Sequence, residues 1–158
     1  MRKVVANTTP IIALADIGQL DLLRQLYGEI IIPTAVLDEI ISEPARSKVG
    51  ESDWIIVESV SNAEQKRLFK SRLHEGEVEV MLLAQEQHAD LVIIDDNAAK
   101  KTAKFLGINV TGTMGILIRA KQNGLIDEVK PLIEELLDKG LYIGQEVVDM
   151  VLEAAGEK

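Results

Sequence analysis

The stretch LVIIDDNAAKKTAKFLGINVTGTMG, residues 91–115, decides the fold class of this chain. Its first four residues, 91–94, are all apolar and mostly β-branched, which predicts a buried strand. A helical segment over about 98–106 follows, then a second strand over 108–110 and a turn, 111–115, that opens another helix. Short strands that alternate with helices are typical of a parallel sheet covered by helices, so the stretch predicts an α/β fold.

The same alternation extends toward the amino terminus. Residues 3–6 predict the first strand, and Thr9 and Pro10 are suited to cap and open a helix directly after it. A leucine-rich helix then leads to a second strand over 29–32. We therefore expect Asn7 at the carboxyl end of the first strand.

A helix that begins near Thr34 follows the second strand. Its apolar residues predict one buried face, which leaves Asp38 and Glu39 on the two flanks of the helix. Periodicity does not choose between these two acids. The residues expected on the buried face are Val36, Leu37, Ile40 and Ile41.

The middle of the chain is more polar. Residues 45–53 predict an exposed loop, residues 54–57 a third strand, and residues 62–73 a polar helix. Another helix is predicted over 76–87, with Glu77 in its first turn, where the helix dipole favours a carboxylate.

Length and composition indicate one domain over residues 1–158, with residues 127–158 as a helical extension that breaks near 140–144. The 47% hydrophobic and 27% charged residues exclude a disordered chain. No window approaches the roughly 18–20 apolar residues of a membrane span, and no signal peptide is evident, so we expect a cytoplasmic protein with no membrane partner. With no cysteine, a thiol nucleophile and a cysteine-ligated metal are excluded.

The net charge of −9 argues against a broad basic face that grips nucleic acid. Two basic clusters remain, and solvated helix faces are the simpler interpretation of both. They are Lys66, Arg67, Lys70, Arg72 and His74, and Lys100, Lys101 and Lys104. His74 and His88 are expected on polar segments, far from the acidic motifs.

Polar residues follow three of the predicted strands, at the edge where ligands bind in open parallel sheets. They are Asn7, Asp95, Asp96, Thr111 and Thr113, and Glu39 and Glu77 lie on helices that reach the same edge. Oxygen ligands of this kind suit Mg²⁺ or Mn²⁺ better than zinc or copper. The adjacent pair Asp95 and Asp96 is the strongest indication, because two like charges repel unless solvent or a cation separates them.

Four segments in this order resemble a PIN-domain protein: NTTPIIALADIGQLDLL, IIIPTAVLDEI, HEGEVEVMLLAQE and LVIIDDNAAKKTAKFLGINVTGTMG. The resemblance covers residues 3–126 and implies a three-layer α/β/α fold with a central parallel sheet of about five strands. It also implies a divalent-metal-dependent ribonuclease, of the branch of predicted nucleic-acid-binding proteins that includes toxins of toxin–antitoxin pairs. The implied partners are single-stranded RNA, an antitoxin protein and a second copy of the chain.

The resemblance also implies roles for individual residues. Glu39, Glu77 and Asp95 would hold one or two Mg²⁺ or Mn²⁺ ions, with Asn7 as a direct ligand or orienting a bound water and Asp96 as a further ligand. Substrate phosphate or water would be contacted by Thr8, Thr111 or Thr113. For a homodimer, the carboxyl-terminal helices provide candidate apolar residues, namely Leu132, Leu136, Val148 and Val151.

Asn7 departs from the family pattern, in which the first motif usually carries Asp. An amide oxygen can ligate a hard cation but adds no negative charge, which favours an alternative: a nucleic-acid-binding or regulatory module with attenuated catalysis. Simpler interpretations also stand. Asn7 could cap the first helix, Glu77 could interact only with the helix dipole, and one of Asp95 and Asp96 could cap the helix that follows.

Overall fold

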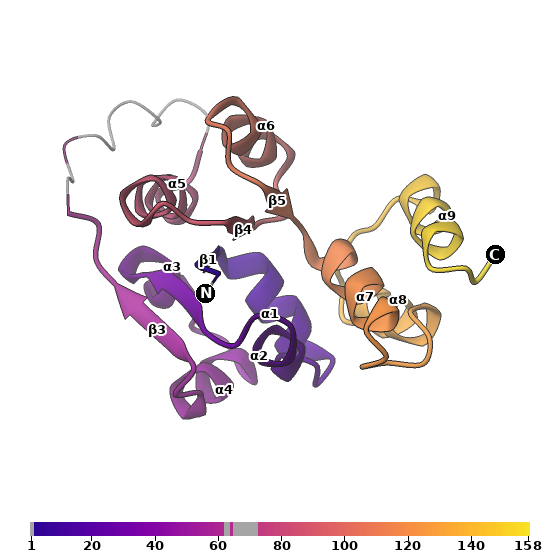
Figure 1. Cartoon of the computed structure of the whole chain (residues 1–158). Helices are drawn as coiled ribbons and strands as arrows, with labels where there is room; N and C mark the ends of the chain where they lie inside the picture. The colour runs from indigo at the N-terminus through magenta and orange to yellow at the C-terminus, as the bar shows by residue number, and fades with distance from the viewer. Residues whose placement is uncertain (1, 62–63, 65–72) are drawn as a thin grey trace.

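The computed structural model describes residues 2–61, 64 and 73–158. A five-stranded, all-parallel sheet forms the centre (Figure 1), in the order β3-β2-β1-β4-β5. The strands are β1 (Val4–Ala6), β2 (Ile30–Pro33), β3 (Ile55–Glu58), β4 (Leu91–Ile93) and β5 (Val110–Thr111). This arrangement confirms the predicted α/β fold and its sheet of about five strands.

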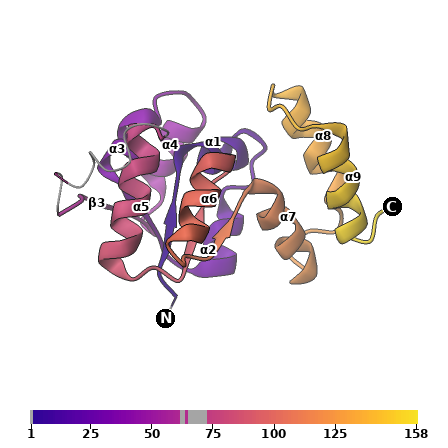
Figure 2. The same ribbon diagram turned by 90° about the horizontal axis from the view of Figure 1, so that it is seen from above.

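Helices cover both faces of the sheet and make the three layers. Right-handed crossovers place the helices that connect β1, β2 and β3 on one face and the helices that connect β3, β4 and β5 on the other. The first group is α1 (Thr8–Asp16), α2 (Asp21–Tyr27), α3 (Thr34–Glu39) and α4 (Ala45–Glu51). The second group, α5 (Glu75–Gln87) and α6 (Asn97–Phe105), stands together in Figure 2.

The core lies where the central strands meet these helices. Every residue of β1 and β4 is buried, as continuous apolar runs in a doubly covered parallel sheet require. Their register pairs Ala6 with Ile93, so the two strands end side by side. Ile11 and Leu14 of α1 and Leu83 of α5 are fully buried in the same core.

The last three helices extend beyond β5 (Figures 1 and 2). They are α7 (Thr113–Gln122), α8 (Lys130–Asp138) and α9 (Gln145–Ala154), and α9 packs on α7. None of the helices in the described ranges is long and apolar enough to cross a membrane.

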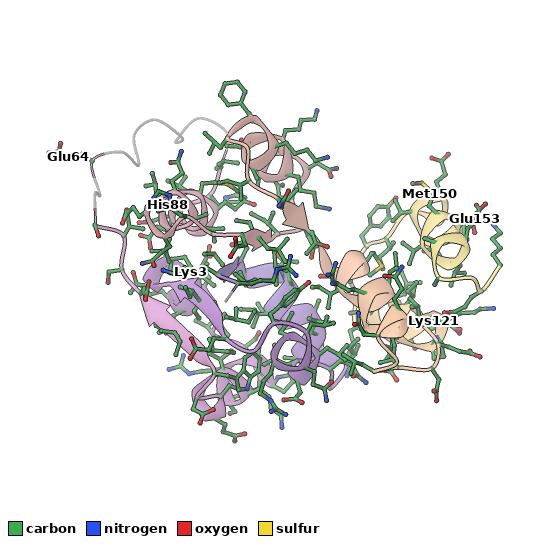
Figure 3. All side chains as sticks on the ribbon, viewed as in Figure 1. Lys3, Glu64, His88, Lys121, Met150 and Glu153 are labelled. Carbon is green, nitrogen blue, oxygen red and sulfur yellow. The ribbon has the colours of Figure 1, made fainter. Side chains whose placement is uncertain are left out.

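Three of the four residues predicted for a dimer contact are instead buried within the chain. Leu132, Leu136 and Val151 are at most 9% exposed, and Val148 is partly buried against the same core. The apolar side chains that do point outward from this region belong to other residues, among them Met150 of α9, labelled in Figure 3.

Two predictions around α3 and α4 were wrong. Residues 45–53 contain a helix, because Ala45 and Val49 lie one turn apart and are both buried, with α4 packed on α1. Leu37 and Ile41 are 39% and 72% exposed instead of buried. The helix ends at Glu39, and Ile40, with φ −87° and ψ 83°, leaves the helical conformation, so the predicted stripe does not continue to Ile41.

The third and fifth predicted strands are shifted by one or two residues, and one predicted helix lies mostly outside the described residues. The third strand runs over 55–58 instead of 54–57, and the fifth over 110–111 instead of 108–110. The predicted polar helix over 62–73 lies almost entirely outside the described residues, as do the basic residues Lys66, Arg67, Lys70 and Arg72.

Candidate active site at the carboxyl edge of the sheet

The strand order reverses between β1 and β4, and this reversal marks the place where open α/β sheets bind ligands. Asn7 directly follows β1, and Asp95 follows β4 by two residues. The backbone N–H of Asn7 donates to the carbonyl of Ile93 at 2.9 Å, which joins the two strand ends. The predicted first and fourth motifs therefore meet at the reversal point.

Asn7 is buried there with its amide oxygen unsatisfied. The residue is 5% exposed, and its Oδ1 is the one buried side-chain oxygen or nitrogen without a hydrogen-bond partner in the part of the chain that the structure describes. Although Asn7 occupies the N-cap position of α1, its side chain makes no capping bond, so the capping interpretation is wrong. A buried polar atom left without a partner costs about 1–3 kcal/mol, so this oxygen is suited to accept a ligand.

Glu39 reaches the same edge from the end of α3. Its Oε1 accepts a hydrogen bond from the Thr8 hydroxyl at 2.7 Å. A side chain on Gly76, at the start of α5, would collide with the Glu39 carboxylate. The structure therefore places Glu39, which periodicity could not distinguish from Asp38, between the first turns of α1 and α5.

Glu77 lies in the first turn of α5 and is 6% exposed. Its Oε1 accepts from the backbone N–H of His74 at 3.0 Å. Burial raises the pKa of the Glu77 carboxyl; the bond from His74 opposes this, and the negative charges of Asp96 and Glu39 add to it. The charges of three carboxylates therefore act on one another across this edge.

The expectation for the two histidines was half right. His74 is exposed, as expected, but it is not far from the acids, because it directly precedes α5 and its backbone N–H donates to Glu77. His88 is the C-cap residue of α5, at the end of the helix opposite to Glu77 (labelled in Figure 3).

Asp95 and Asp96 have separate roles. Asp96 caps α6, with Oδ2 accepting from the N–H of Ala99 at 2.9 Å. Asp95 instead turns to the start of α7, where it accepts from the N–H of Thr113 at 2.7 Å and from the Thr113 hydroxyl at 2.6 Å. One of the two acids is thus a helix cap, and it is Asp96.

Asp95 is also held by its other neighbours. A Cβ on Gly112 would stand 2.5 Å from Asp95 Oδ1 and 3.0 Å from Lys100 Nζ, so the carboxylate and the ammonium group converge on the bare face of this glycine. Lys100 is the member of its basic cluster that reaches the acidic edge, and it is half-buried, so it is not simply part of a solvated face.

The three threonines differ in what they can touch. Thr113 is 1% exposed and bonded to Asp95, so it supports the acid and is not placed for the predicted contact with phosphate. Thr8 donates to Glu39. Thr111 is half-buried, and its hydroxyl fills the space that a side chain on Gly115 would need.

A buried acid that sequence reasoning missed lies beside this edge. Glu79 is 5% exposed and accepts from the N–H of Ala35 at 3.0 Å and from the Thr34 hydroxyl at 3.3 Å, so it bonds the first turn of α3. A polar cavity of about 200 Å³ separates α3 and α5 at this point, and Glu39 also lines it. The one sequence signal was an acid within the apolar run VEVMLL, a position that predicts burial with a partner.

The residues present fit a hard divalent cation in their chemistry. They supply carboxylate and amide oxygens, one of them the unsatisfied Oδ1 of Asn7, and the pKa of Glu77 is raised by burial and by neighbouring negative charge that a cation would neutralise. Among the described residues, however, no three acidic or histidine side chains stand close enough to hold one ion. Ligation by the five predicted residues stays a prediction.

A family model described as PIN domain matches residues 3–157 of the chain. No curated protein matches the chain.

Proposed function

Because that match spans nearly its whole length, the chain belongs to the PIN-domain family, and we propose that it is a divalent-metal-dependent endoribonuclease. The family is of nuclease type and binds nucleic acid. The proposal takes residues 1–158 as one domain and the carboxyl edge of β1 and β4 as its active site. The observation that carries it is the buried, unsatisfied Oδ1 of Asn7 at the strand-order reversal, beside acids from three other segments.

Glu39, Glu77 and Asp95 would hold the ion, Asn7 Oδ1 would ligate it or orient a water, and Asp96 would be a further ligand. A bound Mg²⁺ or Mn²⁺ supplies Lewis acidity toward a phosphodiester and lowers the pKa of a bound water. No covalent enzyme intermediate is needed.

The chain itself positions these groups. Thr8 orients the Glu39 carboxylate through its hydroxyl, and Thr113 holds both oxygens of Asp95. Burial of Asn7 and Glu77 excludes bulk water from the inner side of the site, which strengthens electrostatic interactions there. Lys100 provides a positive charge beside Asp95, suited to a substrate phosphate.

Single-stranded RNA is the proposed substrate, because a chain of net charge −9 is suited to a local contact better than to a long duplex. We also propose a cytoplasmic toxin role, in which a basic antitoxin segment occupies the acidic edge, and a homodimeric state. Light scattering at high protein concentration tests the dimer, and a monomer there would contradict it.

A second function, a binding or regulatory module with attenuated cleavage, is favoured by one observation. Asn7 stands where the family pattern usually has an acid, so its buried oxygen brings no charge to an ion.

One assay separates the two functions. We expect a labelled single-stranded RNA to be cleaved in Mn²⁺, cleavage to stop in EDTA, and activity to be lost in Glu77→Gln and in a Glu39→Ala/Asp95→Asn double variant. Asp138→Asn, which removes an exposed acid at the carboxyl end of α8, is the matched control and should cleave normally. Binding of RNA without cleavage by the wild-type chain would favour the module, and full activity of the double variant would refute the proposed site.

Titration calorimetry provides an independent measurement of the metal site. Mn²⁺ added to EDTA-treated protein should bind, and binding should disappear in Asp95→Asn. No binding up to millimolar metal would refute a metal-dependent mechanism at this edge.

A further inference from the structure

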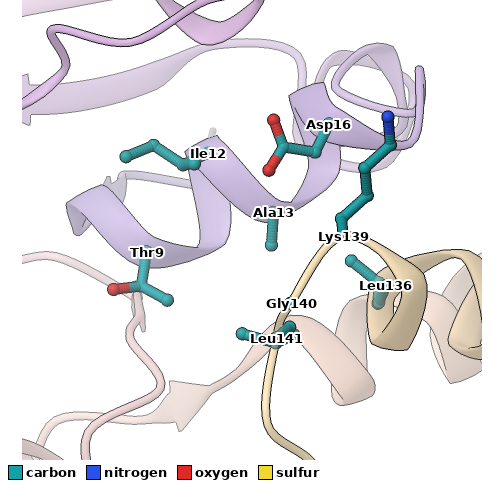
Figure 4. A pocket seen from close by; sticks show the side chains of 8 residues that line it. All are labelled: Thr9, Ile12, Ala13, Asp16, Leu136, Lys139, Gly140 and Leu141. Carbon is teal, nitrogen blue, oxygen red and sulfur yellow. The ribbon is translucent and has the colours of Figure 1, made fainter.

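A cavity of about 220 Å³ lies between α1 and the turn that follows α8 (Figure 4). One wall is a single face of α1, since Thr9, Ile12, Ala13 and Asp16 are spaced by three or four residues. The opposite wall comes from the end of α8 and the residues after it, 139–141. The sequence pattern did not indicate this cavity, because its two walls are more than a hundred residues apart in the chain.

The cavity combines apolar walls with one acceptor and one donor. Ile12, Ala13 and Leu136 line its sides, and Asp16 and Lys139 stand at the same end of it in Figure 4. Within the described residues, neither of these two charged side chains has a hydrogen bond or an ion pair. A packing gap in a core would be lined by apolar atoms alone, whereas this cavity offers unused polar groups to a ligand.

Gly140, which has no side chain, forms part of the wall opposite α1. Gly140 has a φ of +97°, a conformation that L side chains rarely adopt, and no atom lies within 4 Å of where its Cβ would stand. Glycine therefore keeps this wall open by its conformation.

The cavity begins next to the acidic edge. Thr9 directly follows Thr8, which holds Glu39, and lies two residues after Asn7. Asp16 lies seven residues after Thr9 on α1, so the distance between them along the helix axis is about 10 Å at about 1.5 Å per residue. A polynucleotide whose phosphate lies at the acids could therefore direct a neighbouring base along α1.

We propose that this cavity is a nucleobase subsite that prefers guanine, an inference that rests on the proposed ribonuclease function. Its volume of about 220 Å³ is below the roughly 300–1,000 Å³ of sites for larger ligands, so it has room for one ring system and not for a whole nucleotide. The apolar walls receive the faces of the ring, and the charged end reads its edge.

Guanine matches the charged end better than the other bases. Its Watson–Crick edge carries two neighbouring N–H donors, on N1 and N2, which one carboxylate accepts with both oxygens, and the adjacent O6 accepts from an ammonium group. Asp16 and Lys139 provide that acceptor and that donor. Adenine, cytosine and uracil each offer only one donor group on this edge, so they lose the two-bond contact with Asp16.

The test measures nucleotide binding without metal, so that it does not depend on cleavage. GMP, AMP, CMP and UMP are titrated separately into the full chain in EDTA, and the amide and methyl signals of Ala13 and Leu136 are followed by NMR. We expect GMP to shift these signals with millimolar affinity, at least about fivefold tighter than the other three nucleotides. Asp16→Asn should weaken GMP binding about tenfold, as expected for loss of a charge-assisted pair of bonds.

Two further variants make the result specific to the cavity. Ala13→Leu fills it and should abolish the GMP shifts while the melting temperature stays at or above that of the wild type. Asp138→Asn removes an equal charge one residue before Lys139 but outside the cavity lining, and should bind GMP normally. Equal binding of all four nucleotides, or normal GMP binding by Asp16→Asn, would overturn the proposal.

Cleavage then distinguishes the subsite from the function on which it rests. A uridine-rich RNA with a single guanine should be cut next to that guanine by the wild-type chain and at scattered positions by Asp16→Asn. Cleavage without guanine preference in the wild type would refute the subsite and leave the ribonuclease standing. Binding of GMP with no cleavage of any RNA would support the subsite and count against the ribonuclease.

Discussion

Replacing Gly112 by alanine tests how tightly Asp95 is positioned. The new Cβ would stand 2.5 Å from Asp95 Oδ1 and 3.3 Å from the carbonyl oxygen of Ile94, and real Cβ atoms essentially never approach another heavy atom as closely as the first distance. The Nζ atom of Lys100, 3.0 Å from the new Cβ, can move aside because its side chain is long and flexible. The Asp95 side chain is short, so it can avoid the Cβ only by rotating away from Thr113. The backbone of Gly112, with φ −116°, suits any residue, so the effect isolates this contact.

The magnitude follows from the bonds that Asp95 would lose. Its two hydrogen bonds from Thr113, at 2.7 and 2.6 Å, are charge-assisted and worth about 1.5–3 kcal/mol each. Asp95 is half-buried, and water replaces part of the loss, so we expect about 2–3 kcal/mol in total. In a chain of this size about 1 kcal/mol shifts the melting temperature by about 2–4 °C, which predicts a decrease of about 4–12 °C.

Thermal unfolding followed by circular dichroism measures this decrease, and Gly50→Ala is the matched control. Gly50 lies in α4 with nothing within 4 Å of its Cβ position, so alanine should raise the melting temperature there, by about 1–4 °C for a gain of about 0.5–1 kcal/mol. Gly112→Ala should also lose Mn²⁺ binding and cleavage. A variant that melts with the wild type, or above it, would refute the tight placement of Asp95.

Three other substitutions test separate parts of the site. Because burial and neighbouring acids raise the pKa of Glu77, its ionised form destabilises the fold, and wild-type stability falls as pH rises through that pKa. The Glu77→Gln variant should therefore have a higher melting temperature than the wild type in metal-free buffer at neutral pH, and this difference should shrink at acidic pH. A difference that grows at acidic pH would contradict the raised pKa of Glu77. Asn7→Asp should bind Mn²⁺ at least about tenfold more tightly in calorimetry, equal to about 1.4 kcal/mol, and unchanged affinity would remove Asn7 from the ligand set. Asp96→Ala should lower the melting temperature by about 1–8 °C, because it removes an N-cap worth about 0.5–2 kcal/mol. Asp96→Ser can still cap the helix and should keep most of the wild-type melting temperature. Equal melting temperatures of the two variants would count against the cap.

The fold could be predicted from the sequence because its strands are short, continuous and apolar, and each is followed by a helix. Residues 91–94 and 29–32 carry that pattern locally, and a parallel sheet is the arrangement that buries both faces of such strands. The ends of the first and fourth strands could be predicted to within one residue for the same reason, so the sequence alone indicates that Asn7 and Asp95 lie at one edge of the sheet. Helix α4 was not predicted, because only two buried positions, Ala45 and Val49, distinguish its sequence from that of a loop.

The direction of each side chain of the candidate site depends on contacts between segments far apart in the chain. Asp95 and Asp96 are indistinguishable in the sequence, yet one bonds Thr113 and the other caps α6, because α7 packs beside β5 at this point. Glu39 is selected over Asp38 by the hydroxyl of Thr8, 31 residues away. Sequence periodicity reports which face of an element is apolar, but it does not report which polar atom faces which partner. Only packing brings those atoms together and leaves the Asn7 oxygen buried without a partner.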